Sequence, residues 1–165
     1  MSLIKSAVVA VLISAASLGS DPFSSAWADG LKDQVVGSWT IVSNTEDYAD
    51  GSKSMWGPDI KGSLMMAANG QFSLQIGVGG RPVPQGNPAE NPAGKYIAYF
   101  GTYAISDADK TLTFNIVRSS FPAWDGTQQK RIVTAAGDQL SFKAAAPIPS
   151  AKGPFVPTVV WDRVK

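Results

Sequence analysis

The chain contains no histidine and no cysteine, and these absences remove much of the chemistry that side chains commonly perform. It cannot build a Ser-His-Asp triad, a thiolate nucleophile, a Cys/His zinc site or a disulfide. Acid–base work would fall to a desolvated carboxylate or to a tyrosine. The acidic clusters, Glu46-Asp47 with Asp50 and Asp107 with Asp109, lie in predicted turns and lack the spacing of a calcium loop. We therefore expect no bound metal and no cofactor.

Two tyrosines share one face of a predicted strand at residues 97–106. Tyr99 and Tyr103 flank Gly101 at alternate positions, so all three point to the same side of the strand. A tyrosine combines a large contact area with one hydroxyl, which suits it equally to core packing and to orienting a ligand. A glycine inside a strand indicates a bulge, a sharp bend at a barrel corner, or close approach of another group to the backbone.

Three further polar or aromatic residues follow along the chain. Asn115 and Arg118 occupy opposite faces of a predicted strand at residues 111–118, and Arg118 shares its face with the apolar residues. Asn115 faces either outward or into a mixed lumen, and Arg118 is either a charge at the rim or an anchor for an acidic ligand group. Trp124, in a turn-forming connector, either plugs one barrel end or contacts the ligand. The candidate ligand-binding residues are therefore Tyr99, Tyr103, Asn115, Arg118 and Trp124.

These residues are carried by short alternating runs of β-branched and aromatic residues, separated by turn residues. The candidate strands are residues 36–45, 62–67, 71–76, 97–106, 111–118, 128–135, 139–144 and 158–164. Short links force neighbouring strands to run antiparallel, and Asn69-Gly70 is the strongest hairpin signal. The pattern predicts an all-β fold, an eight-stranded antiparallel up-and-down barrel that leaves no free edge, with a two-layer sandwich as the alternative. A barrel of eight strands is either just filled by side chains or holds one small ligand.

The N-terminal residues 1–28 have the pattern of a cleaved secretory signal, which leaves residues 29–165 as the barrel domain. Lys5 precedes an apolar run at residues 7–18, and Ala26-Trp27-Ala28 provides a small-x-small cleavage site. The apolar run is too short to cross a bilayer, and no later segment is long and apolar enough for membrane insertion. We therefore expect a periplasmic or extracellular protein whose packing holds it without disulfides.

Charge and loop composition add two expectations. The chain of 165 residues carries 14 Lys and Arg against 13 Asp and Glu, and this balance gives no footprint for nucleic-acid binding. Residues 77–95 and 145–157 are rich in proline or glycine and resist a strand assignment. They form either solvated loops or a lid over one barrel mouth.

Longer motifs give the chain a family resemblance. Gly37-Ser38-Trp39 opens the first predicted strand. In chain order there follow K-G-S-L at residues 61–64, Y-F-G-T-Y at 99–103, S-F-P-A-W-D-G-T at 120–127 and a terminal V-W-D-R-V. With these motifs, residues 35–164 resemble the small bacterial and fungal lipocalin-like domain family. The resemblance implies a calycin-like β-barrel.

The resemblance also implies structural roles and one departure. In lipocalins a basic residue near the last strand packs over the tryptophan of the G-x-W motif, and Arg163 is placed to pack over Trp39 in this way. Together with Gly37 and Gly101, these two residues are expected to be structural. Relatives often carry a histidine near the position of Asn115, so an acid–base role built on that imidazole is lost here.

Three functions remain compatible with the sequence. The favoured one is an exported barrel that binds a small hydrophobic molecule in its lumen. The others are a structural or interaction barrel with a filled core, and a cyclase- or isomerase-type enzyme that uses Tyr, Asn and carboxylate groups in the cavity. The enzyme is less favoured because Glu46 and Glu90, the only glutamates, lie in or beside predicted loops. A carboxylate that faced Tyr99 or Tyr103 across a cavity would support it.

Overall fold

Antiparallel strands make up most of the computed structural model, which describes residues 30–83 and 94–165. The elements in chain order are α1 (Leu31–Val35), β1 (Gly37–Tyr48), β2 (Lys53–Met55), β3 (Lys61–Met66), β4 (Gln71–Gly77), β5 (Tyr96–Ser106), β6 (Thr111–Ser119), the 3₁₀ helix η1 (Pro122–Trp124), β7 (Gln128–Ala136), β8 (Gln139–Ala144) and β9 (Phe155–Arg163). Each predicted strand is present. The predicted export signal, residues 1–28, lies outside the described residues.

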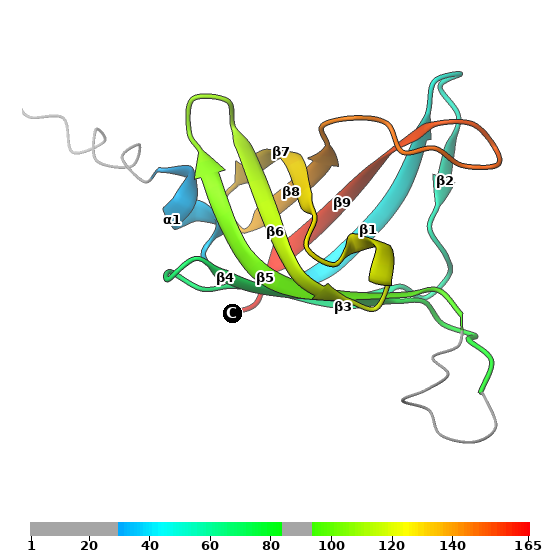
Figure 1. Ribbon diagram of the computed structural model, residues 1–165, viewed down its shortest axis with the longest axis horizontal. Coiled ribbons are helices and arrows are strands. Elements are labelled where there is room, and N and C mark those ends of the chain that lie inside the picture. The colour runs from blue at the N-terminus through cyan, green and yellow to red at the C-terminus, as the bar shows by residue number, and fades with distance from the viewer. Residues whose placement is uncertain (1–29, 84–93) are drawn as a thin grey trace, which may run out of the picture.

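The sheet closes on itself through its first and last long strands (Figure 1). From β3 to β9 each strand pairs antiparallel with the next, and β1 pairs with both β3 and β9. The short strand β2 pairs with residues 45–47 of β1. It lies on the same edge of β1 as β3, which pairs with residues 37–40. The barrel proper therefore consists of β1 and β3 to β9. The predicted eight-stranded up-and-down barrel is confirmed.

One end of the barrel, which we call the closed end, is covered by α1 (Figure 1). Buried side chains fill this end. Leu31 and Val35 of α1 are buried in the core, and the backbone N–H of Leu31 donates to Asp107 Oδ1 at 2.7 Å in the β5–β6 turn. Other buried residues at the core include Trp39, Leu64, Met66, Phe72, Leu112, Phe114 and Leu140. Burial of this set provides the hydrophobic stabilisation that replaces disulfides here.

The predicted contact between Arg163 and Trp39 joins the first and last strands to α1. The Arg163 guanidinium lies 4.2 Å from the centre of the Trp39 ring and donates to the carbonyl oxygens of Val36 and Gln34 at 2.8 and 2.6 Å. Gly37 has a φ of +140°, and a Cβ at this position would come within 2.6 Å of Arg163 Nη1. Glycine is therefore required both for the backbone conformation and for the room that the guanidinium occupies.

Gly101 combines two of the predicted reasons for a glycine inside a strand. The register between β5 and β6 shifts between Phe100 and Gly101, which is a bulge whose extra residue, Val117, lies in the facing strand β6. A Cβ on Gly101 would come within 2.0 Å of the backbone oxygen of Asn115. The close approach of β6 therefore excludes any larger residue unless the two strands separate.

The other end of the barrel, which we call the open end, carries β2, η1 and the segment between β8 and β9 (Figure 1). That segment, predicted to resist strand formation, forms an isolated bridge in which the backbone N–H groups of Ile148 and Phe155 each donate to the other's carbonyl oxygen at 2.7 and 3.0 Å. Part of the other predicted loop, residues 84–93, lies outside the described residues. Among the described residues, no helix has the length and apolar character needed to span a bilayer.

Candidate functional site

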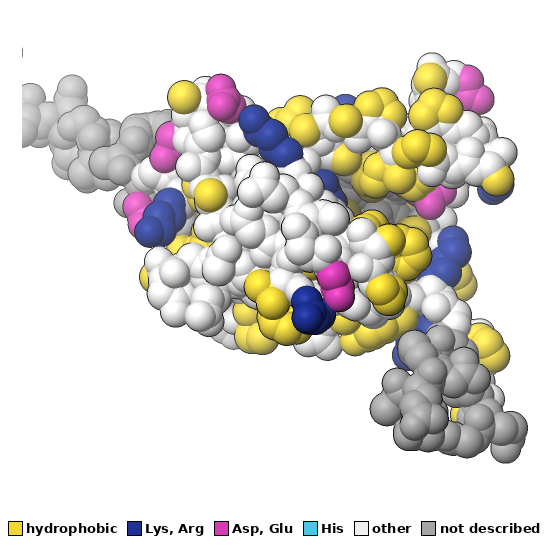
Figure 2. All heavy atoms as spheres, in the orientation of Figure 1, with side chains coloured by type: hydrophobic (Ala, Val, Ile, Leu, Met, Phe, Trp, Pro, Cys, Tyr) yellow, Lys and Arg dark blue, Asp and Glu magenta, His cyan; other side chains and the backbone are white. Residues whose placement is uncertain are grey.

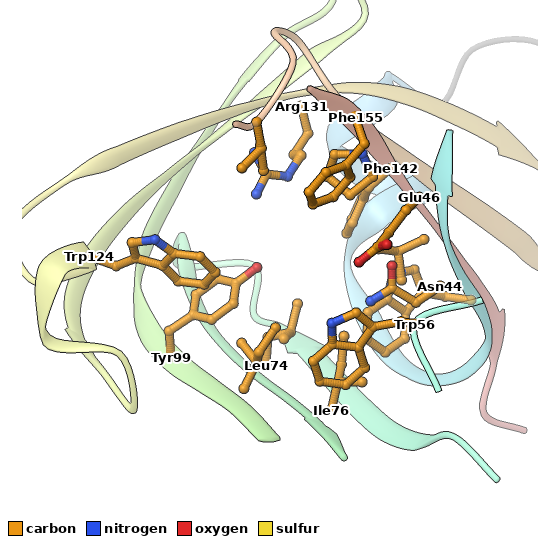
Figure 3. Close-up of a pocket in the computed structure, with 15 residues that line it drawn as sticks. Asn44, Glu46, Trp56, Leu74, Ile76, Tyr99, Trp124, Arg131, Phe142 and Phe155 are labelled. Carbon is orange, nitrogen blue, oxygen red and sulfur yellow. The ribbon is translucent and has the colours of Figure 1, made fainter. Parts of the chain in front are cut away.

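A cavity of about 200 Å³ lies inside the open end of the barrel (Figure 3). Its walls come from most barrel strands, from η1 and from the segment between β8 and β9. The lining residues are Asn44, Glu46, Trp56, Leu74, Ile76, Ile97, Tyr99, Trp124, Arg131, Phe142, Ile148, Phe155, Pro157, Val159 and Trp161. The space-filling view shows hydrophobic side chains gathered at this end of the molecule (Figure 2).

Aromatic rings form a continuous path from the core to the cavity mouth. Tyr99 packs edge-on against Phe114, with ring centres 6.0 Å apart, and against Trp124 at 5.8 Å. Trp124 in turn contacts the exposed Phe121 at 5.4 Å. These edge-to-face arrangements are the favoured geometry for aromatic pairs, so the rings hold one another in place along one wall of the cavity.

Two polar residues of β1 face the cavity because the strand contains a bulge. Its pairing with β9 shifts between Ile41 and Ser43, so the inward positions change from odd to even residue numbers. Asn44 and Glu46 therefore point inward (Figure 3). Asn44 is only 5% exposed, and its Oδ1 has no hydrogen-bond partner.

The Glu46 carboxylate is held from one side. Its Oε2 accepts hydrogen bonds from the Tyr48 hydroxyl at 2.9 Å and from Ser54 Oγ at 3.3 Å. Ser54 belongs to β2, so this short strand helps to orient the Glu46 carboxylate. Fixing a charged group in this way reduces the reorganisation that a bound partner would require.

Arg131 and Tyr99 bring hydrogen-bond donors to the other side of the cavity. The Arg131 guanidinium and the Tyr99 hydroxyl both point into it (Figure 3). Arg131 donates to the carbonyl oxygen of Lys130 at 3.1 Å and to Gln129 Oε1. Burial raises the pKa of the Tyr99 hydroxyl, and the nearby positive charge of Arg131 partly opposes that rise.

Opposite charges therefore face the same cavity without pairing. Among the ion pairs of the described residues, none involves Glu46 or Arg131. In the close-up view the Tyr99 hydroxyl points into the cavity from the side opposite Glu46 (Figure 3). A carboxylate does face Tyr99 across the cavity, which is the arrangement that acid–base chemistry without histidine would need.

The structure brings only some of the sequence-predicted ligand residues to the cavity. Tyr99 and Trp124 line it. Tyr103 faces inward, but it lies toward the closed end, where its hydroxyl donates to the carbonyl oxygen of Ala67 at 2.7 Å. Tyr103 thus ties β5 to the β3–β4 turn and does not reach the cavity.

Asn115 and Arg118 lie outside the barrel lumen. The side chain of Asn115 points outward, whereas Phe114 and Ile116 on either side of it are buried. Asn115 Oδ1 accepts a hydrogen bond from Gln128 Nε2 at 2.8 Å, and Asn115 Nδ2 donates one to Thr102 Oγ1 at 3.4 Å. Arg118 is exposed, and its Nε lies 3.7 Å from Asp125 Oδ2. Asn115 lies on the outward face of β6, and the extra residue Val117 in this strand turns Arg118 outward opposite the exposed Phe100, so the cavity is built without them.

The sequence analysis missed seven polar or aromatic lining residues: Asn44, Glu46, Trp56, Arg131, Phe142, Phe155 and Trp161. Glu46 was expected in a loop, whereas it belongs to β1. Arg131 alternates with buried Val133, but the adjacent Ile132, which is 45% exposed, made the inward face of β7 ambiguous. A charge at alternate positions of an antiparallel strand ordinarily marks its solvent face, so the sequence carried no signal that placed Arg131 in the lumen.

The cavity offers few metal ligands. No group of three or more Asp and Glu residues that could hold a metal ion occurs in the part of the chain that the structure describes. Glu46 is the one carboxylate among the lining residues. The arrangement is suited to an organic molecule with both apolar and polar groups.

Comparison with known protein families agrees with the architecture. A search of curated proteins finds no match to the chain. The family model of the lipocalin-like domain matches residues 36–164, which covers every barrel strand. The chain therefore belongs to the lipocalin-like domain family.

Proposed function

We propose that this protein is exported and binds a small, largely apolar molecule in the cavity at the open end. The observation that carries the proposal is the contrast between the two ends of one lumen. Phe72, Phe114 and Leu112 fill the closed end, whereas the open end keeps a cavity of about 200 Å³. Natural interiors are close-packed, and a cavity lined by apolar groups with a few converging polar ones is typical of a ligand site.

Unpartnered polar atoms support the same function. Asn44 Oδ1 and Trp161 Nε1 are buried without a hydrogen-bond partner, and both residues line the cavity. A buried polar atom without a partner costs about 1–3 kcal/mol. A barrel that served only as a structural unit would gain stability from apolar residues at these positions.

The cavity volume limits the size of the ligand. A cavity of about 150 Å³ lined by apolar residues admits benzene. The cavity here, at about 200 Å³, therefore suits a molecule with one ring and one or two short substituents.

Native mass spectrometry of the protein purified from the cells that produce it tests this function. We expect an additional mass that dissociates on activation, and we expect Ile76→Phe, which adds a ring inside the cavity, to lose it. Val117→Phe is the matched control, because Val117 is 51% exposed on the outer face. A bare polypeptide mass in all three proteins would support the filled, ligand-free barrel instead.

Export is a separate part of the proposal, based on the signal pattern of residues 1–28. Cell fractionation with an antibody against the barrel tests it. We expect the full chain to be recovered outside the cytoplasm with a shortened N-terminus near Asp29. Recovery of an unshortened chain in the cytoplasm would contradict export and leave the cavity proposal standing.

A second candidate, a proton-transferring enzyme, is favoured by one observation. The Glu46 carboxylate and the Tyr99 hydroxyl face the same cavity with Arg131 beside them (Figure 3). Glu46 would remove a proton from carbon, while Arg131 and Tyr99 would stabilise the negative charge that develops. Hydrogen–deuterium exchange at an acidic C–H position of a bound carbonyl compound, lost in Glu46→Gln, would support this function.

A further inference from the structure

We infer that the ligand is a monocyclic aromatic acid with a hydrogen-bond donor at the opposite end of its ring, which rests on the proposed binding function. Its carboxylate would lie against Arg131 and Tyr99, and its donor would face Glu46 and Asn44. The chemical class follows from how the polar groups of the cavity are divided between its two sides.

One side of the cavity carries donors. The Arg131 guanidinium keeps N–H groups beyond the two hydrogen bonds that it makes to Lys130 and Gln129. Tyr99 is 7% exposed, and its hydroxyl points into the cavity beside that guanidinium (Figure 3). A guanidinium and a phenolic O–H together favour a carboxylate, which accepts charge-assisted hydrogen bonds from both.

The other side carries acceptors. Glu46 uses Oε2 to hold Tyr48 and Ser54, and no hydrogen bond in the described part of the chain involves its Oε1. Asn44 adds an amide whose oxygen has no partner. A ligand hydroxyl or amine can donate to this pair, whereas a second carboxylate would be repelled by Glu46.

The surfaces between these two sides favour an aromatic ring. Trp56, Tyr99, Trp124, Phe142, Phe155 and Trp161 all line the cavity. Aromatic rings pack favourably edge to face or offset against one another. The volume of about 200 Å³ limits the body of the ligand to one ring.

Isothermal titration with four compounds of the same ring size tests the inference. The compounds are 4-hydroxybenzoate, which has both groups, p-cresol, which lacks the carboxylate, p-toluate, which lacks the hydroxyl, and p-xylene, which lacks both. We expect 4-hydroxybenzoate to bind at least about tenfold more tightly than each single-group compound, because a charge-assisted hydrogen bond contributes more than one tenfold step in affinity.

Variants assign the two ends of the ligand. Arg131→Met removes the guanidinium and leaves an unbranched, uncharged side chain, and it should remove the preference for 4-hydroxybenzoate over p-cresol. Arg131→Lys, which retains the charge, should restore part of that preference. Glu46→Gln should reduce the preference for 4-hydroxybenzoate over p-toluate. Arg118→Met is the matched control, because Arg118 is an exposed arginine outside the lumen, and it should change no affinity.

The outcomes separate this inference from the function on which it rests. If p-xylene and p-cresol bind as tightly as 4-hydroxybenzoate, and Ile76→Phe abolishes that binding, the ligand class is wrong and the cavity is still a binding site. If none of the four compounds binds, the ligand class is also overturned, and native mass spectrometry of the purified protein decides the binding function separately. An equal loss of affinity in Arg131→Met and Arg118→Met would show that the arginine acts only through overall charge.

Discussion

Single residues at the closed end determine whether this barrel stays closed. Trp39 is 1% exposed, donates from Nε1 to the carbonyl oxygen of Val35 at 2.9 Å, and lies under the guanidinium of Arg163. The tryptophan therefore links α1, the first strand and the last strand. Its loss would open a cavity where three elements meet.

Trp39→Ala should lower the free energy of unfolding by about 3–5 kcal/mol, the usual cost of truncating a buried large aromatic residue. Urea denaturation followed by circular dichroism measures this change. Replacement of the exposed Phe100, which is 50% accessible, by alanine is the control and should cost far less. A loss below about 1 kcal/mol for Trp39→Ala would show that the residue is not a structural plug.

Tyr99 makes stability depend on pH in the alkaline range. Burial raises the pKa of its hydroxyl above the ordinary value of 10.0, so the unfolded chain loses this proton at lower pH than the folded protein does. The stabilising difference is complete below pH 10, and it is lost as the pH rises from there toward the folded-state pKa.

Tyr99→Phe should therefore make the loss of stability above pH 10 less steep, by up to about 1.4 kcal/mol per pH unit. Urea denaturation at a series of alkaline pH values measures the slope. Equal slopes for Tyr99→Phe and the unmodified protein would contradict a buried, neutral Tyr99.

At the scale of elements, bulges decide which side chains reach the lumen. The eight barrel strands could be predicted because alternation and turn residues mark them, as at Asn69-Gly70 between β3 and β4. The inward placement of Asn44 and Glu46 could not, because it depends on the register shift after Ile41 that pairing with β9 imposes. Elements as short as α1 and β2 leave too few residues for a periodic signal.

The close approach of β6 to Gly101 of β5 gives a prediction at this scale. Gly101→Ala should destabilise the protein by about 1–3 kcal/mol or prevent folding, because the added methyl group would meet the backbone of β6. Thermal unfolding measures the change. The control is Gly30→Ala, where the nearest atom to the added Cβ is Asp107 Oδ2 at 3.5 Å. Equal melting temperatures for the two variants would contradict the close approach of the strands.

At the scale of the whole molecule, the barrel lumen is filled with side chains at one end and hollow at the other. Bulky residues such as Phe72 and Phe114 pack 4.4 Å apart between ring centres at one level, whereas Asn44, Glu46 and Arg131 surround a cavity at another. The sequence predicted the barrel and two of the cavity residues, Tyr99 and Trp124. The sequence did not distinguish a filled lumen from a hollow one, because the difference arises only when side chains from many strands meet at the same level along the barrel axis.

Ligand binding by this barrel requires that small molecules enter the cavity at its open end. Amide-resolved NMR during titration with 4-hydroxybenzoate and its three analogues measures entry residue by residue. We expect shift changes confined to the strands that line the cavity, abolished in Ile76→Phe and retained in Val117→Phe. Shift changes spread over the outer face of the barrel, or equal in both variants, would contradict a binding site inside the barrel.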